Sequence, residues 1–184
     1  RAHGWVRQVE NKSKWTEKYK NFDPKFLFVN DGYNLRITEP QASMGLIQID
    51  KIDEFINSRR KNAKKYYEKL ISLGEFFSFQ TTTANSENSH FGFPLIVKNN
   101  KYFNRNEICL YLNNCGIETR PIIAGNLARQ PANSLFEHRI SGELINSDNI
   151  MDNGFSVGVH QSLTDSAIDY VICKINDFVS EKTK

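Results

Sequence analysis

The sequence predicts a fold of the α/β (α+β) class, in which a small sheet carries helices mainly on one of its faces. Three observations lead to this prediction. With 184 residues, the chain has room for one well-buried domain and an appendage, since cores of this size normally stay undivided. Its 39% hydrophobic and 24% charged residues are typical of a folded globular protein. Helical and strand-like segments follow one another in the order helix, strand, strand, helix, strand, loop, strand, helix.

The first segment has a mixed character. Residues 1–31 combine charged and aromatic side chains without a sustained period, so we expect a partly extended segment with a turn at Asp23-Pro24. The sequence starts with Arg1 and shows neither an initiator Met nor a signal-peptide pattern. We therefore expect it to be the continuation of a longer chain.

A helix is predicted from Thr38 onward. Thr38 can cap it, Pro40 lies in the first turn where no N–H is needed, and Gln41 completes a capping box. Apolar residues at helical spacing continue the pattern to Gly74, a residue type that commonly follows a helix end. Because about 35 residues is long for one globular helix, we expect a break within residues 49–53 and two consecutive helices.

The remaining elements are short, except the last. Runs rich in aromatic and β-branched residues predict strands at residues 76–79, 91–97, 117–121 and 155–159. Residues 104–114 form an amphipathic pattern closed by Cys115-Gly116, which predicts a short helix. Thr164 can cap a final helix, whose apolar residues keep the 3.6-residue period to the C-terminus. Between residues 121 and 155 we expect a loop.

Charge and cysteine usage narrow the function classes. The net charge is +3, and residues 1–30 and 51–69 each contribute +4; these stretches are either solvated helix faces or a surface that attracts phosphate-bearing ligands. No nucleic-acid-binding motif accompanies them, so we expect no nucleic-acid partner. The three widely spaced cysteines suit neither a disulfide scaffold nor a metal site, so a cytoplasmic setting is expected. Apolar runs of about five residues are too short to cross a membrane.

The sequence has none of the familiar local catalytic motifs: no Walker loop, GxGxxG, HExxH or GxSxG. Three loop segments nevertheless carry unusual polar residues. In the first, Asn34 and Arg36 stand just before a predicted helix N-terminus, an arrangement that favours an anion. The other two carry side chains suited to phosphates, sugars or bases, namely Arg120, Asn126, Arg129 and Gln130 after one strand and His160 with Gln161 after another. The first two segments are equally compatible with a structural loop, and the third is less specific than they are.

These residues carry a resemblance to a known family. Residues 32–42, with Gly45-Leu46 and the 52–60 helix, resemble the region that follows the cofactor lysine in DegT-type nucleotide-sugar aminotransferases, which are pyridoxal-phosphate enzymes of the type I fold. Segments further along the chain look closest to the 4-keto-6-deoxy-sugar 3-dehydratase branch: residues 116–121, 125–127, 129–131, 142–144, 149–151 and 157–159. The similarity covers nearly the whole chain in consistent order.

The resemblance implies a domain division and a missing part. Residues 1–37 would be the tail of a large domain and a dimer-crossing loop, and residues 38–184 the C-terminal small domain. The Schiff-base lysine, or the histidine that replaces it in the 3-dehydratases, would lie upstream, so the chain alone is expected to be inactive. Residues 1–34 contain no cysteine, which disfavours the iron-sulfur branch of the family.

The resemblance also implies roles for individual residues. Asn34 would reach across a homodimer interface to the phosphate of PLP or PMP, with Arg36 adding positive charge. The nucleotide-sugar side of the site would be lined by Arg120, Asn126, Arg129 and Gln130, with His160 near its mouth. The parent enzyme, an aminotransferase or a 3-dehydratase of deoxysugar and surface (lipo)polysaccharide biosynthesis, would be a homodimer or pair with a separately encoded N-terminal half. Alternatively, the chain is a non-catalytic split-gene or remnant module for dimer assembly or nucleotide-sugar binding.

Overall fold

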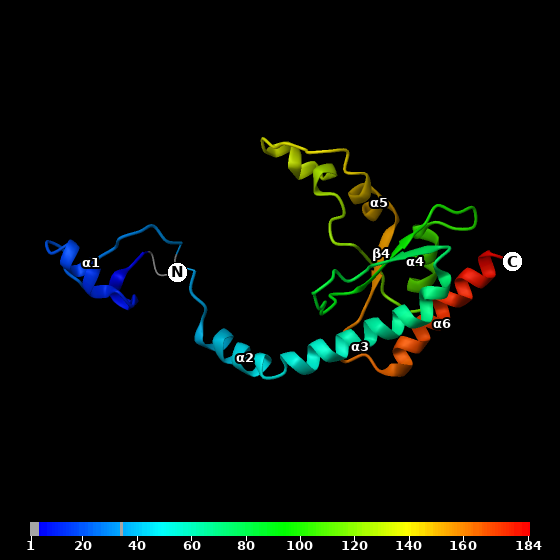
Figure 1. Ribbon diagram of the computed structural model, residues 1–184, viewed down its shortest axis with the longest axis horizontal. Helices are drawn as coiled ribbons and strands as arrows, with labels where there is room; N and C mark the ends of the chain where they lie inside the picture. Colours follow the sequence, from blue (N-terminus) through cyan, green and yellow to red (C-terminus); the bar gives the residue numbers. More distant parts are fainter. Residues whose placement is uncertain (1–3, 34) are drawn as a thin grey trace. The chain divides into compact units, whose positions relative to one another are not determined.

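The computed structural model describes residues 4–33 and 35–184 (Figure 1). The chain divides into two compact units, Arg1–Lys51 and Ile52–Lys184. The boundary expected from the resemblance, after residue 37, stays a prediction. No helix among the described residues is both long and apolar enough to cross a membrane.

The N-terminal unit closes on itself around one tryptophan. Trp5 forms an isolated antiparallel bridge with Phe28, and its ring stacks on Phe26 and Phe28 at centroid distances of 6.3 and 6.0 Å. The Trp5 Nε1–H donates to the carbonyl of Lys25 at 2.7 Å. The predicted turn at Asp23-Pro24 is confirmed, because the Asp23 carbonyl accepts from the Phe26 N–H at 2.9 Å. The aromatic residues of this polar segment thus pack on one another.

Among its described residues, this unit contains the helical elements η1 (Val6–Gln8), α1 (Lys12–Lys18) and α2 (Glu39–Ile49). The sequence did not predict α1. The capping box of α2 is confirmed: Gln41 Oε1 accepts from the Thr38 N–H at 3.0 Å, and the Thr38 side chain caps the first turn in return. Helix α2 ends at Ile49 and α3 (Ile52–Leu70) begins three residues later, which confirms the predicted break.

The C-terminal unit is built on a four-stranded antiparallel sheet of order β1-β2-β4-β3. Its strands are β1 (Phe77–Phe79), β2 (Phe93–Val97), β3 (Arg120–Pro121) and β4 (Gly154–Val157). Phe93 pairs with Val157, and Arg120 pairs with Ser156. All four predicted strands exist, although β3 is only two residues long.

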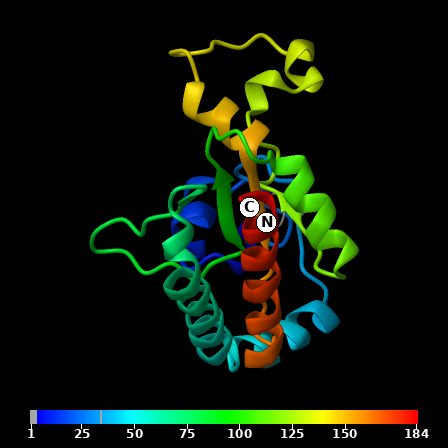
Figure 2. The ribbon, with the colours of Figure 1, turned by 90° about the vertical axis from the view of Figure 1, so that its right-hand side faces the viewer.

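Helices α3, α4 (Arg105–Asn114) and α6 (Asp165–Lys182) cover one face of this sheet, as Figures 1 and 2 show. The alternating pattern of β2 decides which face is buried: Phe93, Leu95 and Val97 point into the core. Their helical partners are the buried Tyr66 and Leu70 of α3, Ile108 and Leu112 of α4, and Ile168, Ile172 and Ile175 of α6. The prediction of a small sheet with helices mainly on one face is confirmed.

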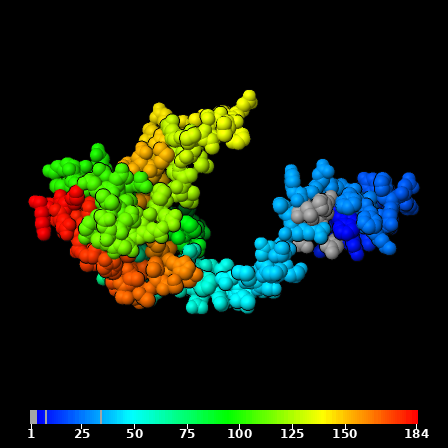
Figure 3. All heavy atoms as spheres, turned by 180° about the vertical axis from the view of Figure 1, so that it is seen from behind, coloured from blue at the N-terminus to red at the C-terminus, as the bar shows by residue number. Residues whose placement is uncertain are grey.

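The segment between β3 and β4 differs from the prediction. The sequence predicts a loop here, but the segment contains η3 (Leu127–Arg129), η4 (Pro131–Leu135) and α5 (Ile145–Asn153). It projects from the rest of the unit (Figures 1 and 3). Helix α5 starts from Leu144 in a left-handed conformation, with no side-chain cap. Its sequence is rich in Asn and Asp, which are poor helix formers. Helix α5 contacts β2 and β4, so tertiary packing overrides local preference here.

Candidate functional site

A large open cavity of about 1330 Å³ lies in the C-terminal unit. Part of its wall is the sheet face opposite the buried residues of β2: Pro94 and Ile96 from β2 and Ser156 from β4 line it. The edge strand β3 adds Arg120 and Pro121. Most of the lining is apolar, with a few polar groups, which is the usual make-up of a small-molecule pocket.

Arg120 is the predicted site residue that lines this cavity. It is exposed, and its guanidinium pairs with the Glu118 carboxylate at 2.6 Å. Its backbone is fixed by pairing with Ser156, whose hydroxyl donates to the Arg120 carbonyl at 3.3 Å. Strand pairing therefore holds Arg120 at the cavity wall, where the solvent-exposed Glu118 is its ion-pair partner.

Two buried polar atoms at the cavity have no hydrogen-bond partner among the described residues: the Tyr66 hydroxyl and His90 Nδ1. Burial raises the pKa of Tyr66 and, together with the nearby Arg60 charge, lowers that of His90, so both side chains are neutral at pH 7. The backbone of His90 is left-handed (φ 52°), and its N–H donates to Asn88 Oδ1 at 2.7 Å. Sequence reasoning missed Tyr66 and His90 as site residues, because neither stands in a recognisable motif.

Asn126, Arg129 and Gln130 are engaged within their own segment. Arg129 Nε and Nη2 donate to the two carboxylate oxygens of Asp148 at 3.0 and 2.7 Å. The buried Asn126 donates to the same carboxylate at 2.7 Å and accepts from the Ala128 N–H. The Gln130 amide donates to the Ala124 carbonyl at 3.2 Å. These side chains brace residues 124–130 against α5.

This bracing has an electrostatic consequence. Hydrogen bonds from Arg129 and then from Asn126 lower the pKa of Asp148 to about 2, and the same ion pair raises the pKa of Arg129. Asp148 is therefore ionised at neutral pH and offsets the charge of Arg129. The substrate-binding role expected of these residues stays a prediction. Asp148 was missed because it belongs to α5, the helix that the sequence did not predict.

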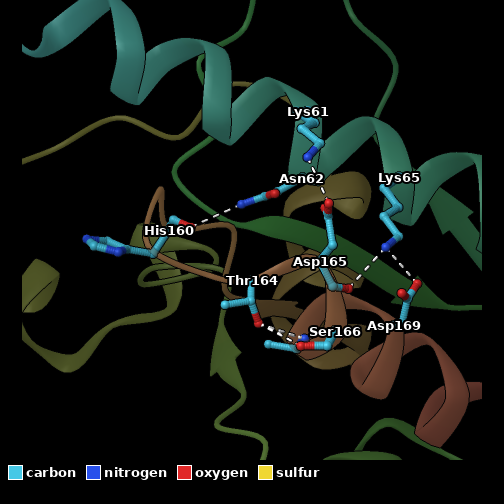
Figure 4. Close-up of polar contacts among 9 residues, drawn as sticks. Lys61, Asn62, Lys65, His160, Thr164, Asp165, Ser166 and Asp169 are labelled. Atoms are coloured by element: carbon cyan, nitrogen blue, oxygen red, sulfur yellow. Dashed lines mark hydrogen bonds and ion pairs between the residues drawn. The ribbon is translucent and has the colours of Figure 1, made fainter.

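His160 lies just after β4, at a polar junction between α3 and α6 (Figure 4). The Asn62 amide of α3 donates to the carbonyls of Val159 and His160 at 3.3 and 3.1 Å. The exposed imidazole points away from this junction, and Nδ1 lies 2.7 Å from the hydroxyl of Ser162.

Ion pairs join α3 and α6 next to His160. Lys61 binds Asp165 at 3.0 Å, and Lys65 binds Asp169 at 2.7 Å. Lys65 also donates to the Asp165 carbonyl at 3.0 Å (Figure 4). The start of α6 is thereby fixed against α3, next to the turn that carries His160.

The predicted cofactor residues belong to the N-terminal unit. Asn34 lies outside the described residues. Arg36 is exposed, two residues before the Thr38 cap of α2. Within the described residues, no group of three or more His, Cys, Asp and Glu side chains could hold a metal ion.

Comparison with known proteins gives a consistent result. The model of the DegT/DnrJ/EryC1/StrS aminotransferase family matches residues 1–176. The lipopolysaccharide biosynthesis protein RfbH of Salmonella typhimurium is 38% identical over 159 residues, which are 86% of this chain and 36% of RfbH. GDP-4-keto-6-deoxy-D-mannose 3-dehydratase of Yersinia pseudotuberculosis is 38% identical over 165 residues, 88% of this chain and 41% of that protein.

Comparison with solved structures gives a result consistent with these sequence relatives. The E. coli GDP-4-keto-6-deoxy-D-mannose-3-dehydratase with bound hydrated PLP superposes with a TM-score of 0.81 at 34% identity, covering 95% of this chain and 45% of that one. An aminotransferase from Psychrobacter cryohalolentis gives the same TM-score at 18% identity over 100% of this chain and 48% of that one, a likeness of fold. The chain spans less than half the length of the curated relatives it matches. The family match over residues 1–176 and these relatives establish that the chain belongs to the DegT/DnrJ/EryC1/StrS aminotransferase family.

Proposed function

We propose that this chain is the C-terminal part of a PLP- or PMP-dependent enzyme that acts on a nucleotide-linked 4-keto-6-deoxy sugar. The observation that carries the proposal is the 38% identity to RfbH and to a GDP-4-keto-6-deoxy-D-mannose 3-dehydratase across 86–88% of the chain. The product would be a deoxysugar or aminosugar for surface polysaccharide. The enzyme would be a homodimer, with each site completed by the large domain and by the partner subunit.

Within the family, the 3-dehydratase branch is the better supported one. The dehydratases among the relatives are 35–38% identical to this chain, whereas the two GDP-perosamine synthases are 24% and 26% identical. A 3-dehydratase removes the C3 hydroxyl of the sugar, and an aminotransferase replaces the 4-keto oxygen by an amino group taken from glutamate. We therefore favour removal of the C3 hydroxyl.

The described residues near α2 fit a phosphate group. Arg36 is an exposed cation suited to phosphate oxygens. The first turn of α2 adds little, because Pro40 has no N–H and the Thr38 N–H is already bound by Gln41 Oε1. In this proposal the phosphate is held by side chains, Arg36 together with Asn34. When bound, the cofactor supplies the electron sink for chemistry at the sugar carbons.

The C-terminal unit would supply the substrate-binding side of the active site. Arg120 places its guanidinium at the cavity wall, where it can hold a phosphate or hydroxyl oxygen of the nucleotide sugar. The Arg129–Asp148 pair, with Asn126, would keep residues 124–130 in place beside it. In this division of labour Arg120 contacts the substrate, while Asp148 acts through the segment that it braces.

The proposal is tested with the full-length polypeptide that contains this chain. It is incubated with PMP, glutamate and GDP-4-keto-6-deoxymannose, and the product is identified by mass spectrometry. Loss of the C3 hydroxyl oxygen supports the dehydratase, and gain of an amino group supports the aminotransferase instead. An Arg120→Gln variant should raise KM, whereas Arg139→Gln, in a loop that does not line the cavity, should not. An unchanged nucleotide sugar would contradict the proposal and favour a binding or assembly module.

A further inference from the structure

We propose that the cavity binds the nucleobase of the nucleotide sugar on its β1 side, where the base stacks on the Phe91 ring and hydrogen-bonds to the Gln80 side chain. The inference deepens the proposed function and rests on it for the sugar part of the ligand. The position of the base rests on three features of the C-terminal unit: a row of residues across the sheet, an exposed aromatic ring and an anchored loop.

One row of residues crosses the whole sheet along the cavity wall. Ser156 of β4 pairs with Arg120 on one side and with Pro94 on the other. The register of β1 with β2 brings Gln80, the residue after β1, level with Pro94. All four residues line the cavity. Neighbouring strands lie about 4.8 Å apart, so three such spacings separate the backbones of Gln80 and Arg120 by about 14 Å. The row suits an extended ligand with two different ends.

The two ends of this row differ in charge. At the β3 edge, Glu118 engages one guanidinium nitrogen of Arg120, Nη2, and the other N–H donors of the guanidinium are suited to phosphate oxygens. On the β1 side the cavity is lined by the amide of Gln80 and by His90, whose pKa is lowered by burial and by the Arg60 charge, so that the ring is neutral at pH 7. An amide carries both donors and an acceptor, as the edge of a nucleobase does. The cavity therefore fits a nucleoside diphosphate, with the phosphates at the β3 edge and the base on the β1 side.

Phe91 supplies an aromatic ring on the β1 side. It lines the cavity and is 87% exposed, more than any other phenylalanine among the described residues. The second phenylalanine of the cavity lining, Phe79, is engaged with the rings of Tyr67 and Phe93 at centroid distances of 5.9 and 6.3 Å. Nucleobases of every kind stack on aromatic side chains, because each has a π-face. Phe91 is therefore the ring of this cavity on which a base can stack.

The loop that carries Phe91 is anchored to α3. Arg60 Nε donates to the Asn88 carbonyl at 3.2 Å, and Arg60 Nη1 pairs with Glu87 at 2.9 Å. Asn88 Oδ1 accepts from the His90 N–H at 2.7 Å, and the His90 backbone is left-handed with φ 52°. Such a backbone persists where the surrounding contacts hold it. Because the residues just before Phe91 are already ordered, a base that stacks on this ring immobilises little additional chain.

Binding is measured by isothermal titration calorimetry on the full-length polypeptide loaded with PMP. The probes are GDP, CDP, UDP and dTDP, together with inorganic pyrophosphate for the phosphate end alone. Phe91→Ala should weaken binding of the tightest nucleoside diphosphate about five- to a hundredfold, the effect of one lost base–aromatic stack, and leave pyrophosphate binding unchanged. Phe91→Tyr, which keeps the ring, should retain the affinity. Phe136→Ala is the matched control, because Phe136 is 70% exposed and does not line the cavity. Gln80→Ala should narrow the differences in affinity among the four nucleoside diphosphates.

Three results would overturn the base site. They are a Phe91→Ala variant that binds the nucleoside diphosphate as tightly as the wild type, equal losses for this ligand and pyrophosphate, and a wild type that binds none of the four nucleoside diphosphates. An unchanged order and spread of affinities in Gln80→Ala would overturn the contact of Gln80 with the base. Turnover separates this inference from the proposed function. A wild type that binds a nucleoside diphosphate through Phe91 but converts no nucleotide sugar refutes the proposed function and supports the base site, whereas conversion without any dependence of binding on Phe91 refutes the base site alone.

Discussion

Replacing the buried Asn62 by Ala should destabilise the C-terminal unit by about 2–3 kcal/mol. The variant loses two hydrogen bonds, to the carbonyls of Val159 and His160 at 3.3 and 3.1 Å. Each such bond is worth about 0.5–1.5 kcal/mol net, and a buried carbonyl left without its donor costs more than an exposed one. Val159 is fully buried, while the His160 carbonyl keeps its bond from Leu163. The expected loss therefore lies in the upper part of the range for two bonds.

The assay is urea unfolding followed by far-UV circular dichroism. Tryptophan fluorescence would not serve, because Trp5 and Trp15 both lie in the N-terminal unit, whereas the CD signal is dominated by helices such as α3 and α6. Asn57→Ala is the matched control: it makes the same change on an exposed position of α3 and should shift the free energy of unfolding by less than about 0.5 kcal/mol. If Asn62→Ala changes the free energy of unfolding as little as this control does, the attachment of the 159–163 turn to α3 is refuted.

Three further predictions concern the cavity and the braced segment. Tyr66→Phe removes a buried hydroxyl that has no partner among the described residues, so it should raise the free energy of unfolding by about 1 kcal/mol in thermal melts; a loss of similar size would reveal a partner. Gly125→Ala should cost about 2 kcal/mol, because Gly125 has φ +61° and an added Cβ would lie 2.5 Å from the Met151 side chain. The folded-state pKa of Asp148, about 2, lies below the ordinary value of about 3.9. Its ion pair therefore stabilises the protein above about pH 4 and loses that effect as the pH falls toward 2. The stability gap between wild type and Asp148→Asn, measured by urea unfolding from pH 7 to pH 2, should accordingly shrink; a constant gap would contradict the Arg129–Asp148 pairing.

Features encoded by neighbouring residues could be predicted from the sequence. The capping box at Thr38, the break before Ile52 and the cap at Thr164 depend on contacts within one helical turn, and the structure has all of them. The strands were found from their aromatic and β-branched runs. Which face of β2 is buried could not be read from the sequence, because residues 93–97 are apolar at every position and only the structure shows that Phe93, Leu95 and Val97 face the core.

Features that depend on distant partners could not be predicted. Asn62 is polar in sequence and buried in structure, because the carbonyls it binds lie 97 and 98 residues away. Arg129 was interpreted as a substrate-facing cation, yet the structure pairs it with Asp148 from a helix of low intrinsic propensity. The specific roles predicted for Asn34, Arg36, Arg120 and His160 came from a family resemblance, and no contact among the described residues tests them.

The measurement that tests the central claim most directly compares two proteins in one turnover assay. The full-length polypeptide and residues 1–184 alone are each incubated with PMP, glutamate and GDP-4-keto-6-deoxymannose, and the nucleotide-sugar products are separated and weighed by mass spectrometry. The account predicts conversion by the full-length polypeptide and none by residues 1–184. Conversion by residues 1–184 alone, or none by the full-length polypeptide, would contradict it.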